Sequence, residues 1–282
     1  MTDLAVIMSV YQNDKLSFVK ESVQSILDQT FSQFHYYIIF DGPVASEIDD
    51  YITSLNDNRI KHYRLEKNGG LAAALNFLLE IVLKNPEYKY IARMDADDIS
   101  MPERFIKQRE FLKANPDISV VGCWYEEIDE SGRHLSYRRL PSDHDALRKR
   151  YLTRTPLAHP SVIYRCELIE KAGYYPTDTV LMEDNILWGR ALSYDLRFAN
   201  VPETLIQYRI DSDFYMRRSG LHYGYCFIRT KCKLGKMNGN KWYYIVVIFF
   251  VGLIKMLPAF LIEIYYGMIL EKKPPGNTEM KL

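Results

Sequence analysis

Three aspartates follow a short apolar run near residue 90. The run is Tyr88–Met94, and Asp95, Asp97 and Asp98 come directly after it. Carboxylates this close repel one another, so the arrangement is costly unless a cation or a positively charged ligand compensates. Oxygen ligands suit a hard divalent ion such as Mg²⁺ or Mn²⁺, usually shared with the phosphates of a substrate. Capping of a helix beginning near Met101 explains one of these aspartates but not three, so the pattern predicts a metal and phosphate site.

Two further polar stretches also follow apolar runs. Asp41 follows the run Tyr36–Phe40 and precedes a glycine, a pair that is equally typical of a tight turn. Asn68-Gly69-Gly70 precedes a helical pattern, where backbone N–H groups can approach a nucleotide, although an ordinary turn explains it as well. Neither GxxxxGK[ST] nor GxGxxG occurs in the chain. ATPase and dinucleotide-binding functions therefore lack their phosphate-binding element.

Short apolar runs alternate with helical spacing over the first 115 residues. We expect strands at Leu4–Val10, Tyr36–Phe40, Ile60–Leu65 and Tyr88–Met94, with helices around 18–27 and 71–82. A further helix is expected after Pro102, where Ser100 and Glu103 match a capping box. This alternation predicts an α/β fold with a Rossmann-like, mostly parallel central sheet flanked by helices. Ligands of such sheets bind at the carboxyl ends of the strands, where the aspartates lie.

The alternation loosens beyond residue 117. We expect strands at Ile118–Ile128, Ser161–Tyr164 and Leu205–Arg209, and helices at Asp145–Leu152 and Ile186–Leu196. Trp188 falls on the second helix beside apolar neighbours, which favours core packing over sugar stacking. Arg93 lies within a predicted strand and is expected to pair with a nearby carboxylate.

A series of motifs in a fixed order spans residues 4 to about 210. The stretches are Val6–Tyr11, Ser25–Phe31, Asp41-Gly42, Asn68–Ala72, Ala92–Asp98, Ala158–Ser161, Met182–Asn185 with Trp188, Val201–Glu203 and Tyr208-Arg209. Each is weak alone, but together they resemble the family 2 glycosyltransferases with the GT-A fold. The likeness is greatest to bacterial enzymes of capsule, exopolysaccharide and O-antigen assembly.

The resemblance implies a nucleotide-diphosphate-sugar donor, a divalent cofactor (Mn²⁺ or Mg²⁺) and inversion at the anomeric carbon. It implies that Asp184 is the catalytic base, although the helix dipole alone also favours an acid at a helix start. It further implies a nucleotide-sugar pocket and a metal site. The pocket residues would be Ser9, Tyr11, Asp41, Asn68 and Asp95, and the metal ligands would be Asp97 and Asp95.

Three further residues are candidates for contact with the acceptor or with phosphate: His159, Glu183 and Asp211. His159 is as well explained as a residue that holds the loop before Pro160. Many relatives have a histidine shortly after the Tyr-Arg strand, where this chain has Asp211, so the sequence departs from the family there. The Gln-x-x-Arg-Trp motif of processive synthases is absent, which favours the addition of one sugar per encounter.

The charges of the chain balance, with 36 Lys+Arg against 36 Asp+Glu among 282 residues. That balance argues against a nucleic-acid partner. Residues 214–282 nevertheless carry 11 basic and 3 acidic residues, a net charge of +8, so residues 1–213 carry −8.

The four cysteines form no CxxC pair, so we expect neither zinc nor disulfides. The N-terminus shows no signal-peptide pattern.

The C-terminal part pairs a basic segment with an apolar one. We expect a catalytic domain at 1–213, a basic connecting segment at 214–241, apolar membrane-associated helices at 242–270 and a flexible tail at 271–282. The uncharged stretch Trp242–Ile254 would span about 20 Å as a helix, against roughly 30 Å of hydrocarbon. We therefore expect peripheral or monotopic attachment to an anionic membrane surface, with packing on the catalytic domain as the alternative. A membrane-spanning hairpin is a further alternative.

These patterns predict a non-processive enzyme at the cytoplasmic face of the bacterial inner membrane. Its acceptor would be a glycan or a polyprenyl-diphosphate-linked sugar. A sugar-nucleotide pyrophosphorylase is an alternative, but it needs a glycine-rich basic loop where this chain has Tyr11–Lys15. The other alternative is a non-catalytic membrane scaffold of the same fold. The presence of Asp97 and Asp184 argues against it.

Overall fold

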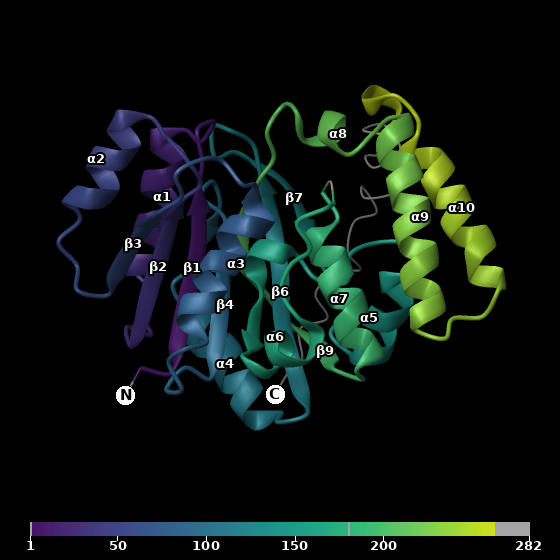
Figure 1. Cartoon of the computed structure of the whole chain (residues 1–282), viewed down its shortest axis with the longest axis horizontal. Coiled ribbons are helices and arrows are strands. Elements are labelled where there is room, and N and C mark those ends of the chain that lie inside the picture. The colour runs from purple at the N-terminus through teal and green to yellow at the C-terminus, as the bar shows by residue number, and fades with distance from the viewer. Residues whose placement is uncertain (1, 180, 263–282) are drawn as a thin grey trace, which may run out of the picture.

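The computed structural model describes residues 2–179 and 181–262 (Figure 1). The expected tail at 271–282 and the end of the apolar segment, 263–270, lie outside these residues. The strands are β1 (Leu4–Val10), β2 (Phe34–Phe40), β3 (Ile60–Arg64), β4 (Tyr90–Met94), β5 (Ile99–Ser100), β6 (Ile118–Ile128), β7 (His134–Arg138), β8 (Ile163–Arg165) and β9 (Arg197–Arg209).

Helices lie between and after these strands. They are α1 (Leu16–Leu27), α2 (Ser46–Ser54), α3 (Leu71–Val82), α4 (Arg104–Ala114), α5 (His144–Tyr151), the short 3₁₀ helix η1 (His159–Ser161), α6 (Glu167–Ala172), α7 (Glu183–Ser193), α8 (Phe214–Arg217), α9 (Leu221–Met237) and α10 (Tyr243–Lys255). The predicted strands and helices of the first 115 residues are confirmed to within a few residues at their ends.

The sheet is mixed, so the prediction of a mostly parallel sheet is confirmed only in part. The strand order is β3-β2-β1-β4-β8-β6-β9-β5, with β7 paired to β6. Strands β1 to β4 are parallel, as predicted. The short strand β8 inserts between β4 and β6 and runs antiparallel to both. Strands β6 and β9 still run in the direction of β4, so their carboxyl ends reach the same edge of the sheet as those of β1, β2 and β4.

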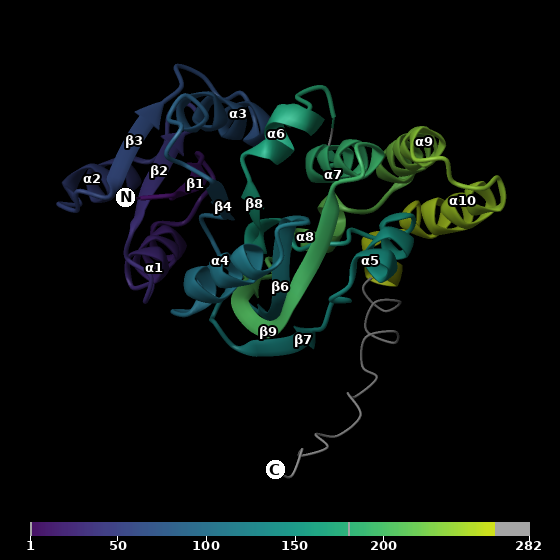
Figure 2. The same ribbon diagram turned by 90° about the horizontal axis from the view of Figure 1, so that it is seen from below.

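Helices cover both faces of the sheet (Figure 2), with an apolar core cluster on each side. Alternate residues of β1 belong to different core clusters, Ala5 and Ile7 to one and Val6 and Met8 to the other. Helices α3, α6 and α7 cover the first face, and α1, α2 and α4 cover the second. Burial on both faces explains why β1 is apolar at every position except Ser9.

The capping-box prediction is wrong. Helix α4 begins at Arg104, and Ser100 belongs to β5, which pairs with β9. Because that pairing keeps the chain extended through Ser100, its hydroxyl is used elsewhere and accepts a hydrogen bond from the Gln29 amide at 3.1 Å.

The C-terminal helices α9 and α10 form an antiparallel pair that packs beside α7 (Figures 1 and 2). The two helices cross closely at Gly224, because this residue has no side chain. A Cβ there would lie only 2.8 Å from the backbone of Gly252. Helix α9 is similarly close to α7, since a Cβ at Gly189 would lie 2.8 Å from Leu234 and even nearer to the Tyr151 hydroxyl. Among the described residues, no helix is both long and apolar enough to cross a membrane.

The close contact at Gly189 predicts a stability effect. Gly189→Ala should lower the free energy of unfolding by about 1–3 kcal/mol, because the added methyl overpacks the junction of α5, α7 and α9. Thermal unfolding would then shift down by several degrees. Gly235→Ala on α9 is the matched control, since its Cβ would meet its nearest neighbour at 3.5 Å. Equal melting temperatures for the two variants would contradict this account of the packing.

Candidate active site

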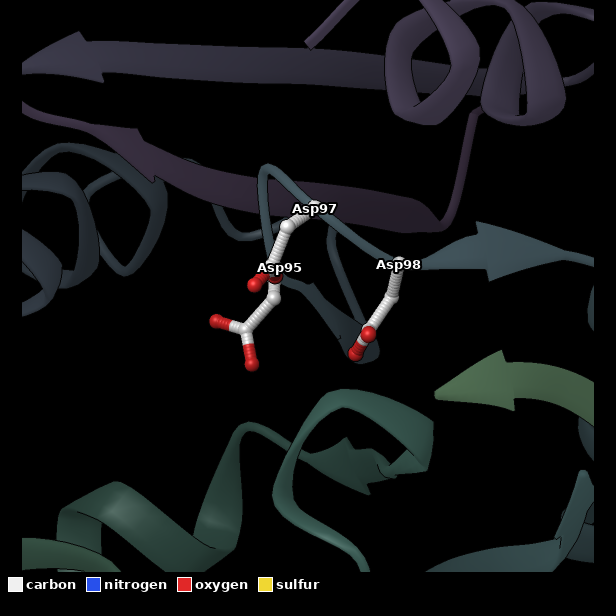
Figure 3. A group of neighbouring side chains, drawn as sticks. All are labelled: Asp95, Asp97 and Asp98. Carbon is white, nitrogen blue, oxygen red and sulfur yellow. The ribbon is translucent and has the colours of Figure 1, made fainter. Parts of the chain in front are cut away.

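The aspartates after β4 form a compact group of carboxylates. One oxygen of each of Asp95, Asp97 and Asp98 lies within 4.8 Å of the others, and all three side chains point to the same side of the loop (Figure 3). Asp98 is fully buried, and its Oδ2 has no hydrogen-bond partner among the described residues. Burial, and then the negative charge of Asp95, raises the pKa of Asp97 to about 6. An all-oxygen set with an unpartnered buried atom fits a divalent cation.

Two arginines hold this loop in place. Arg93 is buried and forms an ion pair with Asp95, which confirms the predicted pairing with a nearby carboxylate. Arg209, at the end of β9, donates from its backbone N–H to Asp98 Oδ1 at 2.8 Å and from its guanidinium to the Asp97 carbonyl at 2.8 Å. In the sequence Arg209 stands out only as part of a motif, and its role here was not predicted because it depends on the pairing of distant strands.

A fourth carboxylate, which was not predicted from the sequence, faces the same group. Asp14 lies in the loop after β1, where its Oδ2 accepts a hydrogen bond from the Tyr11 N–H at 2.8 Å. Burial is the main cause that raises its pKa to about 8, and the charges of Asp97 and Asp95 add to it. The loop after β1 therefore contributes to the acidity of the site.

The other candidates for the nucleotide pocket lie at the same sheet edge. Asp41 is 2% exposed, and its Oδ1 accepts the Gly69 N–H at 2.7 Å. The Asn68 amide donates to the Asp41 carbonyl at 3.3 Å. Gly42 has a φ of +79°, and a Cβ there would collide with the Asn68 backbone, so this glycine permits the close approach of the two loops. Asp41 thus serves the tight turn and also anchors the Asn-Gly-Gly loop.

Asp184 lies in the first turn of α7. Its Oδ1 accepts hydrogen bonds from the Asn185 N–H at 2.6 Å and from the Asn185 amide at 3.1 Å. Its Oδ2 has a long contact of 3.5 Å with the Thr155 hydroxyl. Burial raises the pKa of Asp184, whereas the Asn185 hydrogen bonds and the charges of Lys231 and Arg93 oppose the rise. Burial and the neighbouring Asp184 charge also raise the pKa of Glu183.

One cavity of about 350 Å³ joins the two acidic centres. Asp95 of the aspartate group and Glu183 and Asp184 of α7 line its wall. Residues of the C-terminal helices, Tyr223 and Phe227 of α9 and Lys255 of α10, also line it. Residues about 90 positions apart in the sequence thus face one space, and the C-terminal helices complete its wall.

The remaining candidates differ in their surroundings. His159 lines the cavity, but its Nε2 lies 2.9 Å from the Tyr175 hydroxyl, and burial lowers its pKa well below the usual value. Asp211 pairs with Arg217 at 2.8 Å and does not line the cavity. Trp188 is fully buried and packs edge-on against His159 and Phe198, which confirms the prediction of core packing.

Comparison with known proteins identifies the class. Residues 5–173 match the family described as Glycosyl transferase family 2, and the chain belongs to that family. It is therefore a glycosyltransferase.

Among individual relatives, the amylovoran biosynthesis glycosyltransferase AmsE of Erwinia amylovora is 32% identical over 78% of this chain and 80% of its own. The UDP-Gal:α-D-GlcNAc-diphosphoundecaprenol β-1,3-galactosyltransferase of Escherichia coli is also 32% identical, over 83% of this chain and 84% of its own.

Solved structures establish the fold. TarS of S. aureus (residues 1–349, with UDP-GlcNAc) matches with a TM-score of 0.65 and 17% identity over 96% of this chain and 76% of its own. The mannosyltransferase PcManGT of Pyrobaculum calidifontis, with GDP-Man and Mn²⁺, has a TM-score of 0.63 and 16% identity over 96% and 81%. The fold is therefore GT-A-like, with a mixed, curled sheet flanked by helices.

The raised pKa values predict how stability depends on pH in the absence of divalent ions. A carboxyl whose folded-state pKa exceeds its ordinary value keeps its proton in the folded state after the unfolded chain has released it, so stability falls as pH rises between the two values. For Asp14 that window runs from 3.8 to about 8. Asp14→Asn imitates the protonated form and should raise the melting temperature by several degrees at pH 8 but hardly at pH 4. Differential scanning calorimetry in EDTA measures this, and a pH-independent difference would contradict it.

Proposed function

We propose that this chain is a metal-dependent inverting glycosyltransferase of bacterial surface polysaccharide synthesis. It moves a sugar from a nucleotide-diphosphate donor to a hydroxyl of a lipid-linked glycan acceptor. The observation that carries the proposal is the single cavity lined by Asp95 and by Asp184. Membership of the glycosyltransferase family argues against the pyrophosphorylase alternative.

The donor would bind at the carboxyl ends of β1, β2 and β4. Asp41, fixed by the Gly69 N–H, would read the base, and Ser9, Tyr11 and Asn68 would line the pocket around it. Asp95 and Asp97 would hold Mn²⁺ or Mg²⁺, with Asp95 also near the ribose. When bound, the ion would neutralise the charge that develops on the leaving diphosphate. The repulsion among the clustered carboxylates supports a cation at this place.

Asp184 would act from the other side of the sugar. Its Oδ2 would accept the proton of the acceptor hydroxyl while the hydroxyl oxygen forms the new bond to the anomeric carbon. The bond from that carbon to the diphosphate breaks, and the nucleoside diphosphate leaves with the electron pair. Attack from the face opposite the leaving group inverts the anomeric centre. General base catalysis of this kind contributes about 10²–10⁴-fold.

The acceptor side of the cavity supports a phosphorylated acceptor. Arg154, Arg218 and Lys255 line it together with the aromatic residues Phe214 and Phe227. Guanidinium and ammonium groups suit a diphosphate, and aromatic faces suit sugar rings or the start of a lipid chain. The Escherichia coli relative is named for a diphosphoundecaprenol-linked acceptor, which agrees with this chemistry. Glu183 and His159, which line the same wall, would contact the acceptor sugar.

The C-terminal helices would attach the enzyme to the membrane. Helix α10 exposes a run of large apolar side chains, with Phe250 at 63%, and Trp242 before it is 76% exposed. Exposed apolar surface of this extent marks an interaction site. Together with the net charge of +8 in residues 214–282, it supports peripheral or monotopic binding to anionic lipid at the cytoplasmic face of the inner membrane.

Two substitutions separate donor binding from transfer. Asp97→Ala should abolish metal-dependent donor binding, because it removes a proposed ligand of the ion. Asp184→Asn should retain donor binding but lower transfer about 10²–10⁴-fold, because the amide cannot accept the proton. Calorimetry with Mn²⁺ against UDP-, GDP-, dTDP- and CDP-sugars, followed by transfer assays, measures both. Full transfer by Asp184→Asn would remove this residue as the base.

The acceptor assignment predicts a selective effect on KM. Arg154→Gln should raise KM for a polyprenyl-diphosphate-linked sugar about tenfold or more, because a charge-assisted contact to phosphate is lost. KM for the same sugar on a neutral aglycone should not change. Arg148→Gln, at an exposed position on α5, is the matched control. Equal KM values for both acceptors in Arg154→Gln would contradict a diphosphate contact there.

Membrane attachment is tested by flotation with phosphatidylglycerol vesicles. Phe250→Glu should weaken binding about tenfold or more, since burial of a phenylalanine contributes about 1.5–3 kcal/mol. Tyr137→Glu, at a similarly exposed position on β7, is the control. Absence of the wild type from the vesicle fraction would refute the attachment.

A further inference from the structure

A lysine of the C-terminal helix α9 is buried behind the proposed base. Lys231 is 1% exposed. Its Nζ donates to the Tyr151 carbonyl at 2.5 Å and to Asn185 Oδ1 at 2.8 Å, and it lies 3.8 Å from the centre of the Tyr151 ring. A buried ammonium is costly even with these partners, and an apolar side chain would fill the same space at lower cost. The charge therefore calls for a functional explanation.

Asn185 connects this lysine to Asp184. An ammonium group can only donate, so it must face the carbonyl oxygen of the Asn185 side chain. The Asn185 amide nitrogen then faces the other way and donates to Asp184 Oδ1 at 3.1 Å. Because Oδ1 also accepts the Asn185 backbone N–H, it is saturated by protein donors. The other oxygen, Oδ2, has only the long Thr155 contact and is left for a substrate proton.

We propose that Lys231 is a positioning residue for the transfer reaction. Acting through Asn185, it orients Asp184 and favours its carboxylate form, so that Oδ2 presents a basic lone pair to the acceptor hydroxyl. This inference rests on the proposed role of Asp184 as the base.

The packing around Lys231 keeps the ammonium in place. The hydroxyl of Tyr151 on α5 donates to the backbone carbonyl of Asn185 at 2.8 Å, which fixes the position of the ring. Gly189 on α7 allows the Tyr151 hydroxyl and Leu234 of α9 to approach closely. The lysine is thus enclosed by α5, α7 and α9, and the C-terminal helix is linked to the reaction centre through a chain of hydrogen bonds.

The charges around both groups fix the direction of the expected pH effect. Asp184 faces Lys231 from α9, Arg93 from β4, Glu183 from its own helix, and Tyr151 and Tyr175. Lys231 faces Asp184 and, from α10, Lys255. Burial lowers the pKa of Lys231 to about 7, which the negative charge of Asp184 opposes. Burial raises the pKa of Asp184, and the positive charge of Lys231 opposes that rise. Without the lysine the pKa of Asp184 should therefore be higher, and its carboxylate should form less readily.

The test is the pH profile of transfer by Lys231→Met, which keeps the aliphatic stem and removes the charge. We expect kcat to fall about tenfold to a hundredfold, in line with the loss of a hydrogen bond that involves a charged group. The acid limb of the profile should move up by about one pH unit. Donor binding, measured by calorimetry, should be unchanged. Lys113→Met, an exposed lysine on α4, is the control and should behave as wild type.

Asn185→Ala and the double variant provide a second test, which stands even if Lys231→Met folds poorly. Asn185→Ala should move the acid limb in the same direction. In the double variant, the total shift of the acid limb should be smaller than the sum of the shifts of the two single variants. A wild-type profile in Asn185→Ala, or strictly additive shifts, would overturn the inference. So would a Lys231→Met variant that is less stable but has an unchanged profile and kcat.

A parallel assay of Asp184→Asn separates this inference from the proposed function. If Asp184→Asn is fully active, the proposed base is wrong, and with it the proposal for Lys231. If Asp184→Asn is inactive but both other variants keep the wild-type profile, only the proposal for Lys231 fails.

Discussion

The structure depends on the mutual repulsion of carboxylates gathered at one edge of the sheet. Asp95, Asp97 and Asp98 leave β4 together, and Asp14 faces them from the loop after β1. Arg93 and Arg209 hold the loop but leave Asp98 Oδ2 without a hydrogen-bond partner among the described residues. Beyond the Arg93 ion pair, protonation or a bound cation would relieve this repulsion. The same constraint supports the proposed binding of a metal-bound diphosphate.

The second half of the fold places a different carboxylate opposite this cluster. Strand β8 inserts between β4 and β6, and α7 packs beyond it with Asp184 in its first turn. Helices α9 and α10 also line the cavity, so that the wall with Asp184 and the apolar face of α10 belong to one packed unit. In the proposed function, an acceptor with a lipid tail would meet the membrane surface and the base through the same helices.

Much of this was predictable from the sequence because the signals are local. Apolar runs marked β1 to β4, and three aspartates in four positions marked the acidic loop. A strand was predicted at Ser161–Tyr164, close to β8, but its antiparallel insertion between β4 and β6 was not predictable. Its direction and neighbours depend on contacts between distant parts of the chain, which a short apolar run does not encode. The roles of Asp14, Arg209 and Lys231 depend on contacts between residues far apart in the sequence, 46 positions for Lys231 and Asn185 and 80 for Lys231 and Tyr151. Local patterns do not encode such contacts.

In the proposed function a donor sugar lies between the aspartate loop and Asp184. A crystal structure of the Asp184→Asn variant with Mn²⁺ and its nucleotide-sugar donor would show whether it does. We expect an anomalous manganese peak bound by Asp97 and Asp95, with the anomeric carbon of the donor facing residue 184. A metal bound elsewhere, or an anomeric carbon turned away from residue 184, would contradict it.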